Sequence, residues 1–377
     1  MNRIKLGNSV FEGLNNAYLL SVDDGDRTTT DRDGDGPVTL VDTGIATADV
    51  RADLEDGLAN VGVAIGDVEQ VLLSHWHEDH AGLAGWIQGK SGATVRAHAA
   101  DAPLIGGDAG AREEMQARQR ELFDEWGMPD GPREELLEFM SSFDDARGDP
   151  ADVTPFESGE RFRAGEREIE ALHLPGHAAG LSGFVVGADG NGPNTDGTDS
   201  EGTGRTDGGG TGWENREDRG GGLFSGDALL PRYTPNVGGA DVRVDRPLGK
   251  YLQTLTRIAE RDFSVAWPGH RDRIADPSGR AREIAVHHRE RTERVVEILR
   301  EHGPTDAWTV SAHLFGDLSA IHILHGPGEA YAHLDHLTGN AVEAVHEGES
   351  GGAIEYRLTE RDPNLDSLFP GVALADT

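Results

Sequence analysis

The chain has 377 residues, of which 68 are acidic and 34 basic, so its formal net charge is −34. At roughly 150 residues per domain, this length predicts about two domains. Cysteine is absent, which excludes disulfides, a thiolate nucleophile and cysteine-ligated metal. Any metal site must therefore be built from His, Asp and Glu.

The basic residues are almost all arginine, since only Lys5, Lys90 and Lys250 are lysines. A surface this acidic and this poor in lysine stays soluble when salt screens its self-repulsion. We therefore expect a protein of a salt-loving organism, interpreted as a haloarchaeon. Acidic disorder is the alternative, and regular hydrophobic patterning over most of the chain argues against it.

Two features of the sequence predict a cytoplasmic protein with no membrane partner. No apolar stretch approaches the ~18 residues that a membrane-spanning helix needs. Residues 1–20 carry scattered charges and lack the long apolar core of a signal peptide.

The first part of the chain is predicted to consist of short strands, a helix and turns. Apolar runs at 16–22 and 38–41 flank an acidic, glycine-bearing segment at 23–37, which we interpret as a disordered loop. Residues 49–61 have helical periodicity. Residues 68–73 are predicted to form a buried strand that runs directly into a histidine-rich segment.

The middle of the chain contains a charged helical region at 111–143, which either covers a core or shapes the mouth of a substrate site. Strands are predicted at 168–174 and 183–186. Residues 187–222 are dense in Gly, Asp, Thr and Asn, so we interpret them as a disordered insertion. This insertion contains no GxxxxGK[ST] pattern, which argues against a phosphate-binding loop.

The last part of the chain is predicted to begin with two helices separated by a strand. These elements are a helix at 251–258, a strand at 264–267 and a long charged helix at 280–301. We place a domain boundary near 277–279. The predicted domains are 1–275, which carries the chemistry, and a small C-terminal domain at 280–377.

The strongest chemical signal is the segment HWHEDH at residues 75–80, directly after a predicted buried strand. Imidazole and carboxylate are good ligands for Zn²⁺ and similar ions. His75 and His77 alternate in an extended turn and can face one ion, while Asp79 and His80 can face a second. One segment completes neither site, so ligands from distant positions are required.

Three further residues meet that requirement, namely His177, Asp227 and His270. Each follows a predicted strand and is preceded by glycine, which permits tight turns and close backbone approach. A single residue of this kind is a weak signal, because polar residues at strand ends are often only caps. Together with the histidine-rich segment, the three reinforce one another.

The motifs HWHEDHAG, LPGHAAG, FSGDAL and WPGH, with an earlier VDTG, resemble those of the metallo-β-lactamase-fold hydrolase superfamily. The resemblance covers roughly residues 10–275 and implies an α/β protein, a four-layer αβ/βα sandwich with two metal ions at one edge. It implies His75, His77 and His177 as ligands of the first ion, Asp79, His80 and His270 as ligands of the second, and Asp227 as the bridge. Asp42 would support the ligands without binding metal. Zn²⁺ is the expected ion, and Fe or Mn would suit the same ligands.

Two later segments resemble more particular relatives. Residues 227–235 and 247–257 resemble glyoxalase II-like hydrolases that carry a C-terminal winged-helix extension. Residues 280–360 resemble the winged-helix tail of the family that includes mitochondrial β-lactamase-like endoribonucleases. We expect three residues after the bridging aspartate to line the substrate pocket: Arg232, Tyr233 and Asn236.

These observations predict a dinuclear metal-dependent hydrolase, which uses a metal-bridging hydroxide to cleave an ester or thioester of a small molecule. The alternative is a metal-dependent endoribonuclease whose winged-helix tail grips RNA. Residues 271–377 contain ten arginines against 19 acidic residues, which disfavours nucleic acid as a partner. We expect the tail to pack against the catalytic domain or against a second copy in a homodimer. A metal-binding protein without turnover is disfavoured because all seven ligand positions are filled.

Overall fold

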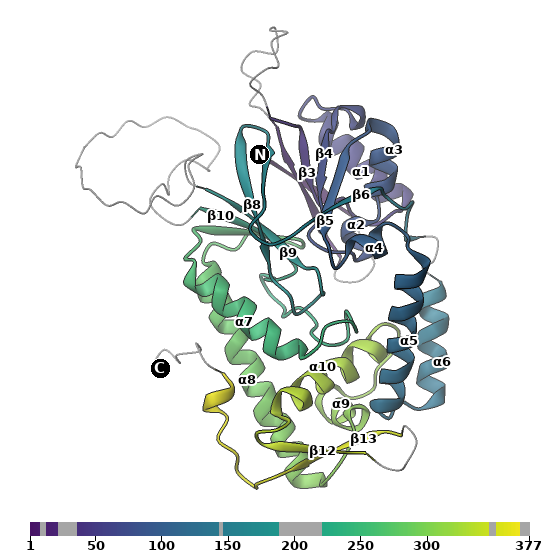
Figure 1. The fold of residues 1–377 in the computed structure, drawn as a ribbon, viewed down its shortest axis with the longest axis vertical. Helices are drawn as coiled ribbons and strands as arrows, with labels where there is room; N and C mark the ends of the chain where they lie inside the picture. Colours follow the sequence, from purple (N-terminus) through teal and green to yellow (C-terminus); the bar gives the residue numbers. More distant parts are fainter. Residues whose placement is uncertain (8–12, 22–35, 143–145, 188–220, 347–351, 370–377) are drawn as a thin grey trace, which may run out of the picture.

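Figure 1 shows the computed structural model, which describes residues 1–7, 13–21, 36–142, 146–187, 221–346 and 352–369. Two sheets face each other in its upper half, and helices make up most of its lower half. Most of the acidic loop predicted at 23–37 and of the insertion predicted at 187–222 lies outside the described residues.

The first sheet has six strands in the order β1-β2-β3-β4-β5-β6. They are Asn2–Leu6, Asn15–Leu20, Thr39–Val41, Gln70–Leu72, Thr94–His98 and Val153–Phe156. Strand β2 pairs antiparallel with β1 and β3, whereas the pairs from β3 to β6 are parallel. The carboxyl ends of β3 and β4 therefore lie at the same edge of the sheet, where Asp42 and His75 follow them.

The second sheet has five strands in the order β11-β10-β9-β8-β7. They are Arg161–Ala164 (β7), Arg167–His173 (β8), Ser182–Val186 (β9), Gly222–Gly226 (β10) and Val265–Pro268 (β11). Only β10 and β11 run parallel. A buried cluster between the sheets joins Tyr18 and Leu72 of the first sheet to Phe184, Phe224 and Trp267 of the second.

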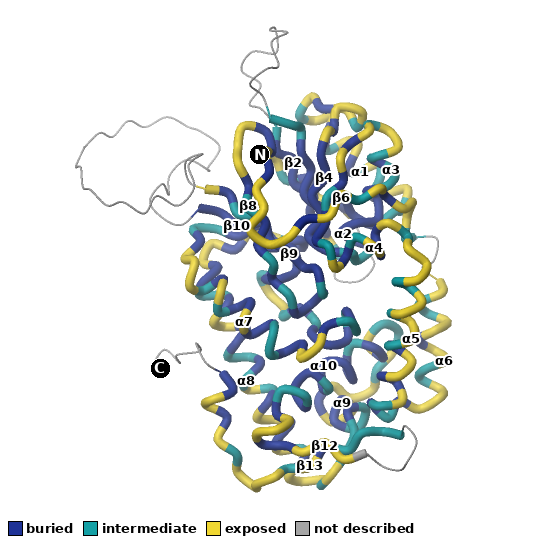
Figure 2. The backbone as a smooth tube through the Cα atoms, in the orientation of Figure 1, coloured by how far each residue is buried: buried dark blue, intermediate teal, exposed yellow. Residues whose placement is uncertain are grey.

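Helices cover the outer faces of both sheets. Helix α1 (Ala48–Ala59) and helix α3 (Ala84–Ser91) share one apolar cluster with the first sheet. Helix α7 (Pro247–Glu260) and helix α8 (Pro277–His302) share another with the second sheet. The result is the αβ/βα sandwich that the sequence predicts, and Figure 2 shows the buried strands at its centre.

The region predicted to be helical at 111–143 contains two helices, α5 (Ala109–Glu125) and α6 (Asp130–Ser141). The chain turns between them at Gly127, whose φ of 71° suits a residue without a side chain. These two helices stand side by side along one flank of the molecule (Figure 1). The half of the molecule that contains the sheets also includes two short helices, α2 (Glu78–Ala81) and α4 (Ala102–Ile105), and a 3₁₀ turn at Ile65–Asp67.

The last part of the chain adds helices α9 (Ala307–Phe315) and α10 (His322–Leu337), and an antiparallel hairpin of β12 (Val342–His346) and β13 (Ile354–Leu358). A 3₁₀ turn follows at Asp366–Leu368. One apolar cluster runs from α7 through α8, α9 and α10 to this hairpin. The boundary predicted near 277–279 falls at the first turn of α8, which the Asp276 side chain caps by accepting from Gly279 N. The division into two domains and the winged-helix comparison stay predictions.

Candidate metal centre

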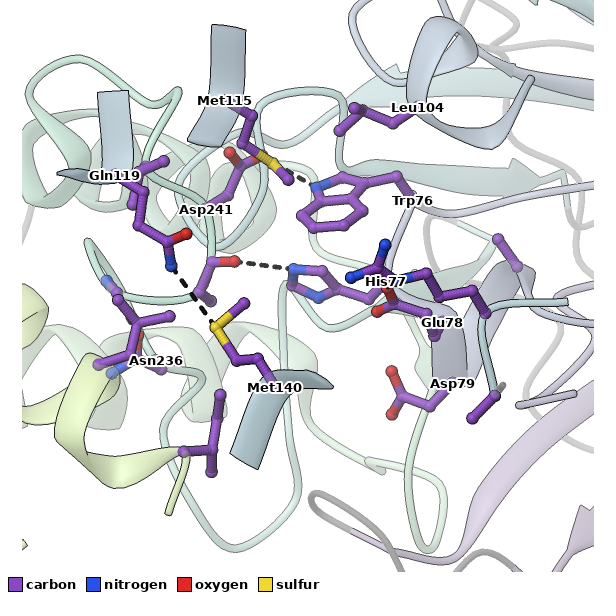
Figure 3. A pocket seen from close by; sticks show the side chains of 18 of the residues that line it. Trp76, His77, Glu78, Asp79, Leu104, Met115, Gln119, Met140, Asn236 and Asp241 are labelled. Atoms are coloured by element: carbon purple, nitrogen blue, oxygen red, sulfur yellow. Dashed lines mark hydrogen bonds and ion pairs between the residues drawn. The ribbon is translucent and has the colours of Figure 1, made fainter. Parts of the chain in front are cut away.

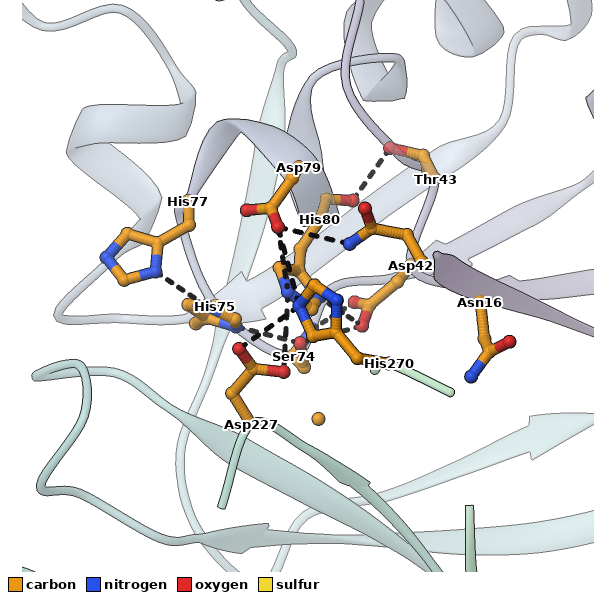
Figure 4. A network of polar contacts seen from close by, with 12 residues as sticks. Asn16, Asp42, Thr43, Ser74, His75, His77, Asp79, His80, Asp227 and His270 are labelled. Atoms are coloured by element: carbon orange, nitrogen blue, oxygen red, sulfur yellow. Dashed lines mark hydrogen bonds and ion pairs between the residues drawn. The ribbon is translucent and has the colours of Figure 1, made fainter. Parts of the chain in front are cut away.

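Seven side chains predicted to bind metal lie together at the edge where the carboxyl ends of several strands meet. Figure 4 labels all of them except His177. They come from the turn after β4 (His75, His77), from α2 (Asp79, His80), and from the turns after β8 (His177), β10 (Asp227) and β11 (His270). Because strand ends bring them together, residues almost 200 positions apart in the sequence become neighbours.

The first group consists of His75, His77 and His177. The Nδ1 atom of His77 lies 2.9 Å from Nε2 of His75 and 3.1 Å from Nε2 of His177. Three imidazole nitrogens thus converge on a single point. This is the trio expected to hold the first ion.

The second group consists of Asp79, His80 and His270. The Oδ2 atom of Asp79 lies 3.8 Å from Nε2 of His80 and 3.4 Å from Nε2 of His270. Asn15 donates a hydrogen bond of 3.1 Å to the same oxygen and so fixes the carboxylate. This is the trio expected to hold the second ion.

Asp227 lies between the two groups. Its Oδ2 atom is 3.7 Å from Nε2 of His177 and 3.4 Å from Nε2 of His270, while its Oδ1 atom is 3.5 Å from Nε2 of His80. One carboxylate therefore faces both trios, as a bridging ligand must.

Three of the five histidines donate their second ring N–H to a backbone carbonyl. His77 Nε2 donates to Ala240 O at 3.0 Å, His177 Nδ1 to Asn236 O at 2.8 Å, and His270 Nδ1 to Gly13 O at 3.0 Å. A carbonyl oxygen can only accept, so each ring nitrogen at these contacts carries the proton. The opposite nitrogen then faces the centre, where its lone pair can bind a metal ion, which is how a protein orients metal-binding imidazoles.

Asp42 holds the remaining part of the cluster. Its carboxylate accepts from Ser74 N at 2.7 Å and from Ser74 Oγ at 2.8 Å, and it lies 3.0 Å from Nδ1 of His80. Asp42 has a φ of 58°, a left-handed conformation that Asp tolerates better than most residues. Asp42 therefore contacts the ligand His80 on the side that faces away from the centre, in the supporting position that the sequence resemblance implies.

Steric crowding explains why glycine precedes two of the ligands, at Gly226 and Gly269. A Cβ atom at Gly269 would lie 2.4 Å from Cε1 of His80 and 2.6 Å from Oδ1 of Asp227. Gly226 has a φ of 48°, and its Cβ would lie 2.7 Å from Cβ of Ser74. The site can close only because these positions carry no side chain.

The electrostatic balance of the site favours cations. Burial alone would raise the pKa of Asp227, but His270 and His80 hold it well below its usual value. Burial likewise opposes ionisation of Asp79, yet His80 and His270 lower its pKa. Burial alone would lower the pKa of His270, and Asp227 raises it to about 9. Both aspartates are thus ionised, and the protons of His80 and His270, the two histidines whose pKa is raised, offset their charge. A divalent ion would replace those protons.

Three buried atoms fit a metal better than any contact within the described residues. Nε2 of His80, Nε2 of His270 and Oδ1 of Asp227 are all buried, and the part of the chain that is described offers them no hydrogen-bond partner. Leaving three buried polar atoms unsatisfied in one place is costly, and a coordinated ion would satisfy all of them.

A cavity of about 700 Å³ opens from this cluster toward helices α5 and α6 (Figure 3). Asn236, one of the three residues predicted to line the pocket, does line it. The lining includes neither Arg232 nor Tyr233. Both are exposed, and the Tyr233 ring lies 5.3 Å from the guanidinium of Arg271.

Apart from Asn236, sequence reasoning missed the loop at 236–241, which fixes several of the site's side chains. Besides the two carbonyls that orient His77 and His177, the loop carries Asp241, whose carboxylate accepts from Trp76 Nε1 at 3.1 Å and from Ala179 N at 2.9 Å. The guanidinium of Arg243 joins Asp241 to the buried Asp101. The only signals in the sequence of this loop were Gly238, Gly239 and Asp241, and no motif connects these residues to the ligands.

The loop is fixed in turn by helix α10. Glu329 accepts from Asn236 Nδ2 at 3.1 Å and from Val237 N at 3.3 Å, and it forms an ion pair with Arg291 of α8. Gly328 packs so closely that its Cβ would lie 2.3 Å from Cα of Gly239. A chain of contacts therefore runs from the C-terminal helices to a predicted metal ligand.

None of the helices in the described residues has the length and apolar character needed to pass through a bilayer.

Comparison with known proteins agrees with this geometry. Residues 31–191 match the family model described as "Metallo-beta-lactamase superfamily". The chain is 26% identical over 334 residues to the "Probable metallo-hydrolase YqjP" of Bacillus subtilis (strain 168), which covers 86% of this chain and 91% of the relative.

Solved structures match over nearly the whole chain. A metallo-beta-lactamase family protein from Thermus thermophilus is 28% identical, with a TM-score of 0.70 over 94% of this chain and 97% of that one. A beta-lactamase domain protein from Burkholderia ambifaria shares the fold, with 22% identity, a TM-score of 0.68 and coverage of 94% and 90%. The fold and these matches support the assignment of the chain as a hydrolase of the metallo-β-lactamase superfamily.

Proposed function

We propose that the protein binds two divalent metal ions, of which Zn²⁺ is the expected kind. We propose further that it hydrolyses an ester or thioester of a small molecule, as glyoxalase II-like enzymes do. The observation that carries the proposal is the convergence of two trios of ligand atoms on a shared carboxylate, at the inner end of a cavity of about 700 Å³. A cavity of this size suits a small-molecule ligand.

The ions, when bound, would supply activated water at neutral pH and positive charge for the oxygen of the carbonyl under attack. His75, His77 and His177 would hold the first, Asp79, His80 and His270 the second, and Asp227 both. The chain's own contribution is to keep these groups in place. The carbonyls of Asn236 and Ala240 fix two imidazoles, and Asn15 fixes the Asp79 carboxylate.

The alternative function is cleavage of RNA gripped by the C-terminal helices. Two observations favour the small-molecule function. The residues of α8 and α10 that face the loop at 236–241 stabilise that loop, as Arg291 and Glu329 do. Four of the six arginines of α8 are paired with carboxylates, namely Arg280, Arg289, Arg291 and Arg300, so little of the positive charge of this helix is left for the basic patch that RNA requires.

Elemental analysis and a paired assay test the proposal. Purified protein should contain close to two metal ions per chain, and Asp227→Ala should lose both metal and turnover. S-lactoylglutathione and a labelled single-stranded RNA are assayed side by side at high salt, because the surface is so acidic. Hydrolysis of the thioester alone supports the proposal. Cleavage of the RNA alone, or full activity of metal-free protein, overturns it.

A further inference from the structure

The cavity has two chemically different walls (Figure 3). The inner wall consists of the predicted metal ligands. The outer wall is largely apolar and comes from α4, α5, α6 and the start of α10. Its apolar members are Leu104, Ile105, Met115, Phe123, Met140, Ile321 and Leu324. A water molecule or an acetyl group would leave most of this surface uncovered, so the wall is suited to a larger apolar group.

Helix α5 contributes six residues to the cavity lining from one face. The residues at this face follow helical spacing and are Arg112, Met115, Gln116, Gln119, Arg120 and Phe123. Gln119 is buried, and its amide lies 3.8 Å from the sulfur of Met140. Trp76 lies between this face and His77, with its indole N–H fixed by Asp241 (Figure 3). A chain of carbon atoms could thus extend from the metal ligands along α5.

A positively charged side chain, Arg112, lies near the start of α5 on the same face. The Arg112 guanidinium is half-buried and donates to the carbonyl of Leu104 at 3.3 Å, while its Nε atom is buried with no partner in the described residues. No carboxylate of the described chain lies within ion-pair distance of Arg112, although acidic residues outnumber basic ones two to one. Glu78, which also lines the cavity, lies 3.9 Å from Arg147; burial raises the pKa of Glu78, and the charges of Arg147 and Arg112 both oppose that rise.

From these observations we infer that the substrate is an amphipathic thioester or ester, with an apolar acyl chain longer than acetyl along α5 and a carboxylate or phosphate near Arg112. This inference rests on the proposed function, because it names the substrate class of the same site. The reaction is hydrolysis: water adds its oxygen to the acyl carbon, the bond from that carbon to sulfur or oxygen breaks, and the leaving thiol or alcohol takes up a proton.

A series of synthetic thioesters tests both parts of the inference. Acetyl, butanoyl, hexanoyl and octanoyl groups are attached to 3-mercaptopropionate, which carries a carboxylate, and to its neutral amide. We expect kcat/KM to rise about three- to fourfold per added methylene until the wall is covered. We expect the carboxylate series to exceed the neutral series about tenfold.

Variants connect these effects to the named residues. Met115→Gln should flatten the dependence on acyl length, and Arg112→Gln should reduce the ratio of kcat/KM between the carboxylate series and the neutral series from about ten to about one. Arg118→Gln is the matched control, because Arg118 lies on the same helix but is already paired with Glu121 and Glu125. The control should behave as the wild type does.

A binding measurement separates this inference from the proposed function. Tryptophan fluorescence of the metal-free protein is followed during titration with the thioethers 3-(butylthio)propionate and 3-(octylthio)propionate, which keep the carboxylate of the thiol half and cannot be hydrolysed. The octyl compound should bind more tightly, and Arg112→Gln should weaken its binding about tenfold. Turnover of thioesters with no dependence on acyl length or on Arg112 overturns the inference alone. No turnover by the metal-loaded protein, with 3-(octylthio)propionate still bound through Arg112, overturns the proposed function alone.

Discussion

Replacing Glu329 by glutamine tests whether the C-terminal helices position the metal ligands. The variant keeps the shape of the side chain and one oxygen that can accept from Asn236. It places an amide in contact with Arg291 and removes the charge that the guanidinium pairs with. Because the new amide and the guanidinium are both donors, they repel each other, and the side chain shifts away from Asn236, whose carbonyl is the group that orients His177.

The structure gives the size of the effect on stability. Burial alone would raise the pKa of Glu329, but His333, Arg291 and His288 together lower it to about 2. Relative to about 4.5 in the unfolded chain, this shift corresponds to roughly 3 kcal/mol of stability at neutral pH, as an order of magnitude. Because the folded pKa is the lower one, this contribution is complete above pH ~5 and is lost as the pH falls toward 2. Glu329→Gln should therefore lower the Tm of the metal-free protein by roughly 5 °C at pH 7, and by less in acid.

The metal is the second readout. Loss of a group that orients a metal-binding histidine usually weakens metal affinity by about 10–100-fold. Competition with a chelator measures this, with Glu293→Gln as control, since Glu293 is an exposed partner of Arg289 whose loss should cost little. If Glu329→Gln kept wild-type Tm and metal affinity, the connection from α10 to His177 would be refuted.

Two further substitutions follow from the same geometry. Asp42→Ala removes the acceptor for Ser74 and His80 and should lower the affinity for the second ion by about 10–100-fold in chelator competition; unchanged affinity would show that His80 is held otherwise. Gly328→Ala should lower the Tm although alanine favours helices, because its Cβ would lie 2.4 Å from N of Gly239. Gly249→Ala, with no atom nearer than 3.7 Å, should gain up to ~1 kcal/mol, and equal shifts for both would contradict the close packing.

The ligand positions could be predicted from the sequence because their signals are local. HWHEDH is contiguous, and His177, Asp227 and His270 each follow an apolar strand and a glycine. The strand ends then bring them together, as the alternation of strand and polar residue implies. The helical region at 111–143 was also predicted, but its break at Gly127 was not, because a single glycine interrupts helical periodicity only weakly.

The loop at 236–241 could not be predicted, because its contribution to the site is made by backbone atoms. Any residue at Ala240 offers the same carbonyl to His77, so side-chain identity there carries no signal. The loop's partners on α10 lie almost 90 residues further along the chain, and only packing brings Gly328 against Gly239. Arg232 and Tyr233 were placed in the pocket by their nearness to Asp227 in sequence, whereas the chain carries them outward before Asn236 returns to the cavity.

The same loop bears on what the C-terminal helices contribute. If the C-terminal helices served only to bind another molecule, their contacts with the metal centre would be incidental and replaceable. Instead α10 supplies Glu329 to the loop and, near its start, Ile321, Leu324 and His325 to the cavity wall. A truncation before α8 would thus remove part of the substrate wall and the anchor of Asn236 together. The geometry therefore favours loss of both metal affinity and turnover over a selective loss of binding to a separate partner.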